Sequence, residues 1–151
     1  MELEITKDLH KKVSRTLQHT LIMQCIFQYL FYLGMNDRPS PVEIVENITK
    51  KPIQLCEPFI RTTFSSAIKN MPEAVENISK HLVDWDFNRL SLVDQAILVL
   101  GYTEIYYCQV PKVVAINICV KMAQKFSSDD SYRYINGVLD KLEAPKLNDE
   151  K

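Results

Sequence analysis

The segment from Leu92 to about Tyr107 is apolar on most of its surface when it is wound as an α-helix. Ser91 precedes this segment and Asp94 lies in its first turn, with the spacing of a capping box, whose side chains satisfy backbone N–H groups at a helix start. A helix that is apolar on most sides is stable only when other elements cover it. The sequence therefore predicts a central helix here, enclosed by the rest of a folded domain.

The remaining apolar residues recur at helical spacing, and no stretch of any length alternates with the period of a β-strand. Ser40 and Glu43 form another capping box, with Pro41 at the first helical position. We expect an all-α fold of about seven helices. They start near residues 2, 41, 55, 72, 92, 111 and 131. The first is expected to run without interruption from Glu2 to Leu33.

The length of the chain fits one domain, because 151 residues are enough to enclose a single hydrophobic core. We expect one compact helical bundle over residues 1–142. Residues 143–151 are polar and are expected to form a disordered tail.

Cysteine usage and hydropathy predict a cytoplasmic protein without membrane contact. The four cysteines show no CxxC pair and no regular framework, which is typical of reduced thiols. The most apolar run, Leu21–Leu33, is shorter than the roughly 20 residues that cross a bilayer. The N-terminus is rich in Glu and Lys, unlike a signal peptide.

The sequence offers no catalytic or metal-binding motif. The three histidines have neither HxxxH nor HxH spacing, so a zinc site is not expected. The motifs GxSxG, GxxxxGK[ST] and GxGxxG are absent from the chain. We therefore expect no catalytic residue, no metal and no cofactor.

A row of basic residues occupies the first predicted helix. Lys7, Lys11, Arg15 and His19 recur every four residues, and Lys12 lies beside them. Such a row can contact successive phosphates of a nucleic acid. Taken alone, such a row is more often an ordinary solvated helix face. Because the net charge of the chain is −1, any nucleic-acid site has to be a local patch of this kind.

An ordered series of short motifs extends from Trp85 to Leu142. Its members are Arg89-Leu90, Asp94, Ala96–Leu98, Leu100-Gly101, Tyr102–Ile105, Val110-Pro111, Val114–Asn117, Lys125-Phe126, Asp129–Ser131 and Tyr134–Asp140. Their order and spacing resemble those of the NusB family of transcription antitermination factors. The resemblance is strong over residues 85–142, moderate over 59–82 and weak over 1–58.

The resemblance implies a bacterial, non-catalytic RNA-binding factor. Such a factor binds boxA-type single-stranded RNA of ribosomal RNA operons together with NusE, a ribosomal protein, and joins the RNA polymerase antitermination complex. It also implies that the basic row binds RNA. This chain departs from the family there, because Thr16, Leu17 and Gln18 occupy positions that are often arginine. Weaker or less selective RNA binding is therefore expected.

The resemblance assigns further RNA contacts to the start of the last helix, at Asp130, Arg133, Tyr134 and Asn136. With its ring at the surface, Tyr134 would stack on an unpaired base, while Asp130 or Asn136 would contact a base edge. Without the resemblance, a packed Tyr134 and a helix cap formed by Asp129 and Asp130 explain the same residues.

Partner contacts are implied at Asp94 and Phe27. Asp94 matches an acidic family position at the contact with NusE, although its place in the capping box also explains it. Phe27 matches an aromatic family position and equally fits the core. Two other functions stay open. One is an interaction protein of the same fold that has lost RNA binding. The other is an RNA-binding domain detached from a ribosomal RNA methyltransferase, of which this chain would be a fragment.

Overall fold

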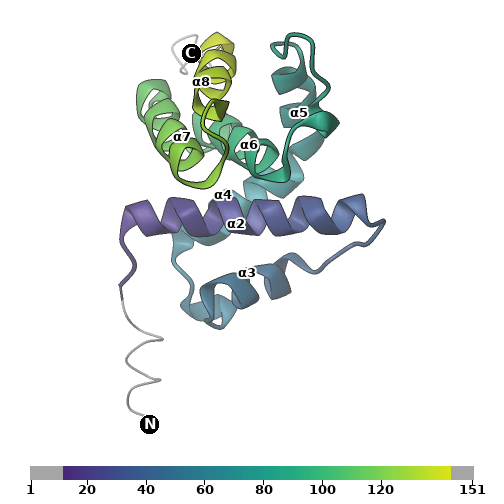
Figure 1. The fold of residues 1–151 in the computed structure, drawn as a ribbon. Coiled ribbons are helices and arrows are strands. Elements are labelled where there is room, and N and C mark those ends of the chain that lie inside the picture. The colour runs from purple at the N-terminus through teal and green to yellow at the C-terminus, as the bar shows by residue number, and fades with distance from the viewer. Residues whose placement is uncertain (1–11, 144–151) are drawn as a thin grey trace, which may run out of the picture.

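The computed structural model describes residues 12–143, and this part of the chain is entirely helical apart from its connecting loops (Figure 1). It contains seven α-helices, so the prediction of an all-α fold with about seven helices is confirmed. They are α2 (Arg15–Gly34), α3 (Pro41–Thr49), α4 (Pro58–Lys69), α5 (Met71–Ser79), α6 (Leu92–Tyr107), α7 (Lys112–Phe126) and α8 (Ser131–Lys141). Two short 3-10 helices, η1 (Ile53–Leu55) and η2 (Phe87–Arg89), lie in the connections.

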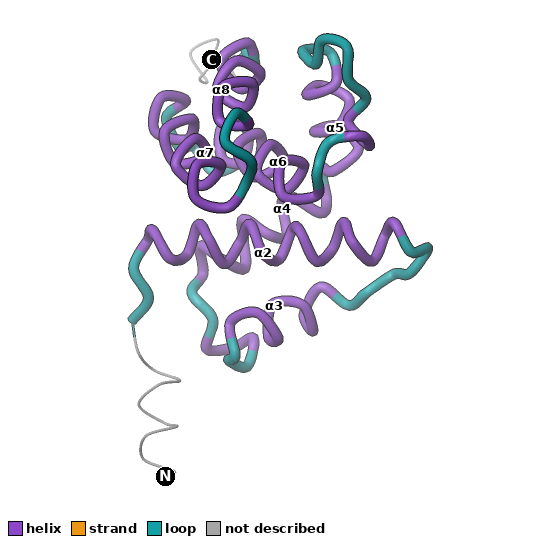
Figure 2. The backbone as a smooth tube through the Cα atoms, in the orientation of Figure 1, coloured by secondary structure: helices purple, strands orange, loops and turns teal. Residues whose placement is uncertain are grey.

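Helix α6 is the centre of the molecule, as its sequence predicted. Every residue from Asp94 to Ile105 is buried. Helices α2, α4, α5, α7 and α8 all pack against α6, which lies within the fold in Figure 2. At Gly101 a Cβ atom would come within 2.9 Å of a methyl group of Leu139 and 3.0 Å of the Cys119 sulfur. The close approach of α7 and α8 to α6 therefore depends on a glycine here.

Helix α2 starts later than expected. Ser14 is its N-cap and accepts a hydrogen bond from the Leu17 backbone N–H at 3.2 Å. Residues 12–14 are not helical, so the prediction of an uninterrupted helix from Glu2 is wrong at this point. The Ser14 hydroxyl satisfies an N–H group that has no carbonyl partner in a first turn, which favours a helix start over continuation. Residues 1–11 lie outside the described part.

Helices α7 and α8 form an antiparallel pair that packs on one side of α6 (Figure 1). Lys112, at the start of α7, donates from its Nζ to the carbonyl oxygen of Leu142 at 2.6 Å. This contact satisfies a carbonyl at the C-terminal end of α8, where a cation is favourable. The position of α8 is thereby fixed at its far end. None of the helices in residues 12–143 is both long and apolar enough to cross a membrane.

Candidate nucleic-acid interface

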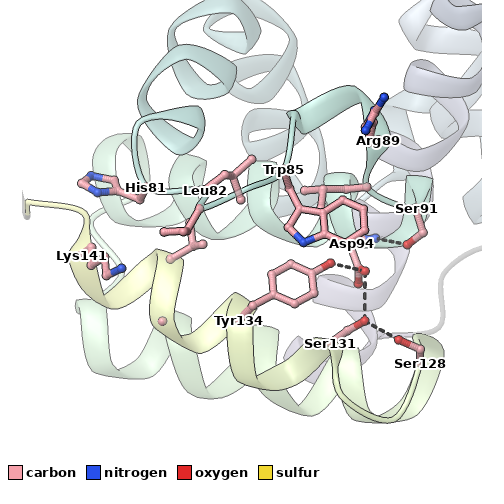
Figure 3. A pocket seen from close by; sticks show the side chains of 14 residues that line it. His81, Leu82, Trp85, Arg89, Ser91, Asp94, Ser128, Ser131, Tyr134 and Lys141 are labelled. Carbon is pink, nitrogen blue, oxygen red and sulfur yellow. Dashed lines mark hydrogen bonds between the residues drawn. The ribbon is translucent and has the colours of Figure 1, made fainter.

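A cavity of 490 Å³ lies between the connection from α5 to α6, the start of α6 and one face of α8 (Figure 3). Val83 and Trp85 line it and remain 67% and 60% exposed. Asp94 and Tyr134 also line it, and Asp94 is only 4% exposed. The cavity therefore combines an apolar, solvent-accessible rim with a buried carboxylate.

The Asp94 carboxylate accepts three hydrogen bonds from hydroxyl groups. The Ser127 hydroxyl donates to Oδ1 at 2.6 Å, and the Ser131 hydroxyl donates to Oδ2 at 3.0 Å. The Tyr134 hydroxyl donates to Oδ2 as well, as Figure 3 shows. Three donors satisfy the hydrogen-bonding capacity of a carboxylate in a buried place. Asp94 thus ties the first turn of α6 to the loop before α8 and to α8 itself.

The predicted capping box at Ser91 forms only in part. The Ser91 hydroxyl accepts from the Asp94 backbone N–H at 3.2 Å, as expected. The Asp94 side chain, in contrast, is directed to α8. Its contribution is therefore mainly tertiary, which the spacing of Ser91 and Asp94 did not indicate.

Tyr134 does not present a free ring to solvent, so the expected surface position needs correction. It is half-buried and packs against the hydrophobic core. Burial, and then the hydrogen bond to the Asp94 carboxylate, raise the pKa of Tyr134 well above its usual range. Most of the ring is therefore packed, which is the alternative that the sequence left open for Tyr134.

The other predicted residues at the start of α8 are accessible. Asp130, Arg133 and Asn136 are all exposed. Asp130 occupies the N-cap position, but its side chain makes no capping hydrogen bond. The Arg133 guanidinium lies 5.6 Å from the centroid of the Tyr132 ring and donates from Nε to the Tyr132 hydroxyl at 3.2 Å. These side chains offer an acceptor, a planar cation and an amide on one helix end.

The basic row is only partly a surface feature. Lys12 and Arg15 are exposed. His19 is 5% exposed, and its Nδ1 lies 2.6 Å from Oε2 of the buried Glu104 on α6. His19 therefore belongs to a buried hydrogen-bonded pair with Glu104 and not to an exposed row. Lys7 and Lys11 lie outside the described residues.

The aromatic ring of Phe27 is half-buried on α2 and packs against the core, so only part of it is available to a partner. The sequence did not identify Ser127 and Ser131 as hydrogen-bond donors to the Asp94 carboxylate. It also did not identify Trp85 as the exposed ring at the cavity. Two serines one helical turn apart beside a predicted helix start were a usable signal. These serines gave no indication that their acceptor is Asp94, which lies on α6.

Residues 12–143 contain no group of three or more His, Cys, Asp or Glu side chains placed to hold a metal ion. Cys25, Cys56, Cys108 and Cys119 are free thiols. Burial is the main reason why the pKa of Cys25 rises to about 12, so this thiol is protonated and unreactive near neutral pH.

The family model of NusB matches residues 18–144, most of the chain. This chain belongs to the NusB family. It is 37% identical over 115 residues to the transcription antitermination protein NusB of Wolinella succinogenes, an alignment that covers 76% of this chain and 84% of that protein. It is 40% identical over 105 residues to the NusB protein of Lactococcus lactis, where 69% of this chain and 48% of that protein are covered.

Solved structures place the fold in the same family. NusB of T. maritima superposes with a TM-score of 0.77 at 25% identity, covering 89% of this chain and 96% of the other. The structure of antitermination factors NusB and NusE in complex with dsRNA gives a TM-score of 0.70 at 17% identity, with 83% and 92% covered. The second likeness is one of fold alone.

Proposed function

We propose that this protein is a non-catalytic transcription antitermination factor that acts in the cytoplasm. In this proposal it binds boxA-type single-stranded RNA of ribosomal RNA operons together with a NusE-like ribosomal protein, and the pair joins the RNA polymerase antitermination complex. Membership of the NusB family supports the transcriptional role. A protein of the same fold has been solved with NusE and dsRNA. The observation that carries the RNA assignment is the exposed set of polar side chains at the start of α8.

Each residue of this set has a distinct task in the proposal. Arg133 offers a planar guanidinium to a phosphate or a base face. Asp130 and Asn136 contact base edges of an unpaired nucleotide. Tyr134 mainly holds the start of α8 through its bond to Asp94, and only its accessible edge is left for a base.

In this proposal the cations near the N-terminus bind phosphates of the same RNA segment. Lys12 and Arg15 are exposed at the start of α2. Lys7 and Lys11 belong to the same proposed contact. Positive charge gives affinity without sequence preference, while the polar groups of α8 supply the preference.

The cavity between α6 and α8 is the proposed contact for the NusE-like protein. Val83 and Trp85 give it an exposed apolar rim of the kind that anchors protein interfaces. Asp94 is too deeply buried to be an open ion-pairing group, so in this proposal it shapes the site by fixing α8 against α6. Phe27 adds its accessible part from α2.

A gel-shift assay with boxA RNA, with and without the NusE-like protein, tests this function. We expect a shift with boxA RNA that a scrambled RNA of equal length does not give, and a tighter shift when the partner is present. Absence of a boxA-specific shift in both conditions would contradict RNA recognition. Retained binding of the partner alone would then favour the interaction protein without RNA binding. The burial of His19 favours that second candidate, because it removes one residue from the exposed part of the predicted row.

A further inference from the structure

A groove of 290 Å³ separates α2 from α7, both of which pack on α6. Figure 1 shows α7 above the first half of α2. The α2 wall contains Arg15, and the α7 wall contains Lys121, Lys125 and Phe126. His19, paired with Glu104, lies among the lining residues as a buried group. Two helices far apart in the sequence thus bring three cations and an aromatic ring to one place.

The three cations of the groove have no acidic neighbour there. Among residues 12–143, no Asp or Glu side chain lines the groove. Within residues 12–143 the close contacts between a basic and an acidic side chain are His19–Glu104 and Lys51–Glu57, and neither includes Arg15, Lys121 or Lys125. In a chain with a net charge of −1, this arrangement is a local excess of positive charge. A concave surface of this kind is complementary to a chain of anions.

Two aromatic contacts give the groove planar groups as well as charge. Phe126 is 37% exposed, and the Lys125 Nζ lies 5.2 Å from the centroid of its ring. The Arg15 guanidinium lies 3.9 Å from the centroid of the Phe59 ring, which holds it in place. Phosphate-binding cations beside an accessible aromatic ring are typical of surfaces that bind single-stranded nucleic acid.

The groove is also continuous with the proposed RNA contacts. Arg15 is the first residue of α2 and belongs to the basic row. Phe126 ends α7, and the short loop that follows it leads to Asp130 at the start of α8. Thr16 lines the same groove beside Arg15. Lys121 and Lys125 supply cations from the facing wall.

We propose that the α2–α7 groove is a further RNA subsite, which carries the RNA strand from Arg15 across α7 to the start of α8. Lys121 and Lys125 bind backbone phosphates, and Phe126 stacks on a base. This inference rests on the proposed function and adds α7 to its RNA contacts. It is a binding step only, and no bond is made or broken.

The test is the salt dependence of boxA RNA binding, measured by fluorescence anisotropy in the presence of the NusE-like protein. The Lys121→Ala/Lys125→Ala variant should bind roughly tenfold more weakly at 0.1 M salt, and its slope of log K against log salt should be shallower by about 1.4, or about 0.7 for each lost phosphate contact. The control variant Lys69→Ala/Lys80→Ala removes two exposed lysines outside the groove. It should keep the slope of the wild type.

A second variant, Phe126→Leu, keeps an apolar side chain but removes the aromatic face. It should weaken RNA binding about fivefold or more without changing the salt slope, because stacking is lost and no phosphate contact is. Phe126→Tyr keeps the face and should bind as the wild type does. Equal affinity of the Leu variant and the wild type would overturn the stacking contact.

The outcomes separate this inference from the proposed function. If the wild type does not bind RNA, both fail. If the wild type binds and the groove variant matches the lysine control in slope and affinity, the groove is not an RNA subsite, while the proposed function stands. If the groove variant binds RNA normally but loses the NusE-like protein, the groove binds an acidic protein surface and the inference is wrong.

Discussion

The cavity between α6 and α8 and the groove between α2 and α7 both combine charged and aromatic side chains, but they satisfy their charges differently. In the cavity, the Asp94 carboxylate accepts three hydrogen bonds from within the protein. In the groove, the rim cations have no acidic partner among the described residues. A buried, fully bonded charge is costly to disturb, whereas exposed cations add little to stability and are available to a ligand. The two regions should therefore respond in different measurements.

The largest effect on the free energy of unfolding is expected for His19, which lies buried beneath the exposed cations of the groove. His19→Ala leaves the Glu104 carboxylate buried without its partner, and Oε1 of Glu104 already has none among the described residues. Removing one partner and leaving a buried carboxylate uncompensated costs about 3–5 kcal/mol in the free energy of unfolding. Urea denaturation measures this loss. Glu104→Gln keeps an acceptor for His19 and should lose less. A loss below about 1 kcal/mol for His19→Ala would show that the pair is not structural.

The next largest loss of stability is expected for Asp94, and it tests whether this carboxylate fixes α8 against α6 at the cavity. Asp94→Ala leaves the hydroxyls of Ser127, Ser131 and Tyr134 without their shared acceptor. We expect the free energy of unfolding to fall by about 2–4 kcal/mol, because hydrogen bonds to a charged group are lost and donors stay buried. Asp94→Asn retains one acceptor oxygen and should fall between the wild type and the Ala variant in urea denaturation. Equal stability of all three would remove the contrast between the two regions.

Tyr134 sharpens the same contrast by separating its hydroxyl from its ring. Tyr134→Phe removes one donor to Asp94 and should cost about 1–2 kcal/mol. Tyr134→Ala also removes a half-buried ring and should cost clearly more. Thermal unfolding of both variants is the measurement. If the Ala variant melts as the wild type does, the ring contributes nothing to packing and is free for RNA.

The smallest effect concerns Glu73, an exposed counterpart of Asp94 that also accepts from tyrosine hydroxyls. Tyr102 donates to it at 2.5 Å and Tyr107 at 2.7 Å, and these bonds lower the pKa of Glu73 from 4.5. A lowered folded-state pKa means that the stabilisation is complete above pH 4.5 and is lost as the pH falls through the folded-state value. Glu73→Gln should therefore flatten the acid limb of a stability–pH curve. An unchanged acid limb would show that these exposed bonds contribute nothing.

Local signals in the sequence predicted most of the fold. The apolar run after Ser91 identified the central helix, and the capping motifs at Ser40 and Ser91 predicted helix starts that the structure has. The motif series after Trp85 identified the family that the matching model shows. These signals depend on residues within one or two helical turns, so they can be recognised without knowledge of the rest of the fold. The early start assigned to α2 was wrong because Ser14 forms a cap within an otherwise helical pattern.

Only the tertiary structure decided which polar groups bond to other groups within the protein and which remain exposed to solvent. His19 pairs with a residue 85 positions away, and Tyr134 bonds to one 40 positions away. The groove likewise joins Arg15 to two lysines on a distant helix. The spacing of a basic row or a helix cap determines where side chains lie around one helix. The packing of α2, α7 and α8 on α6 determines what each side chain meets, because burying a charge is tolerated only where a distant partner satisfies it.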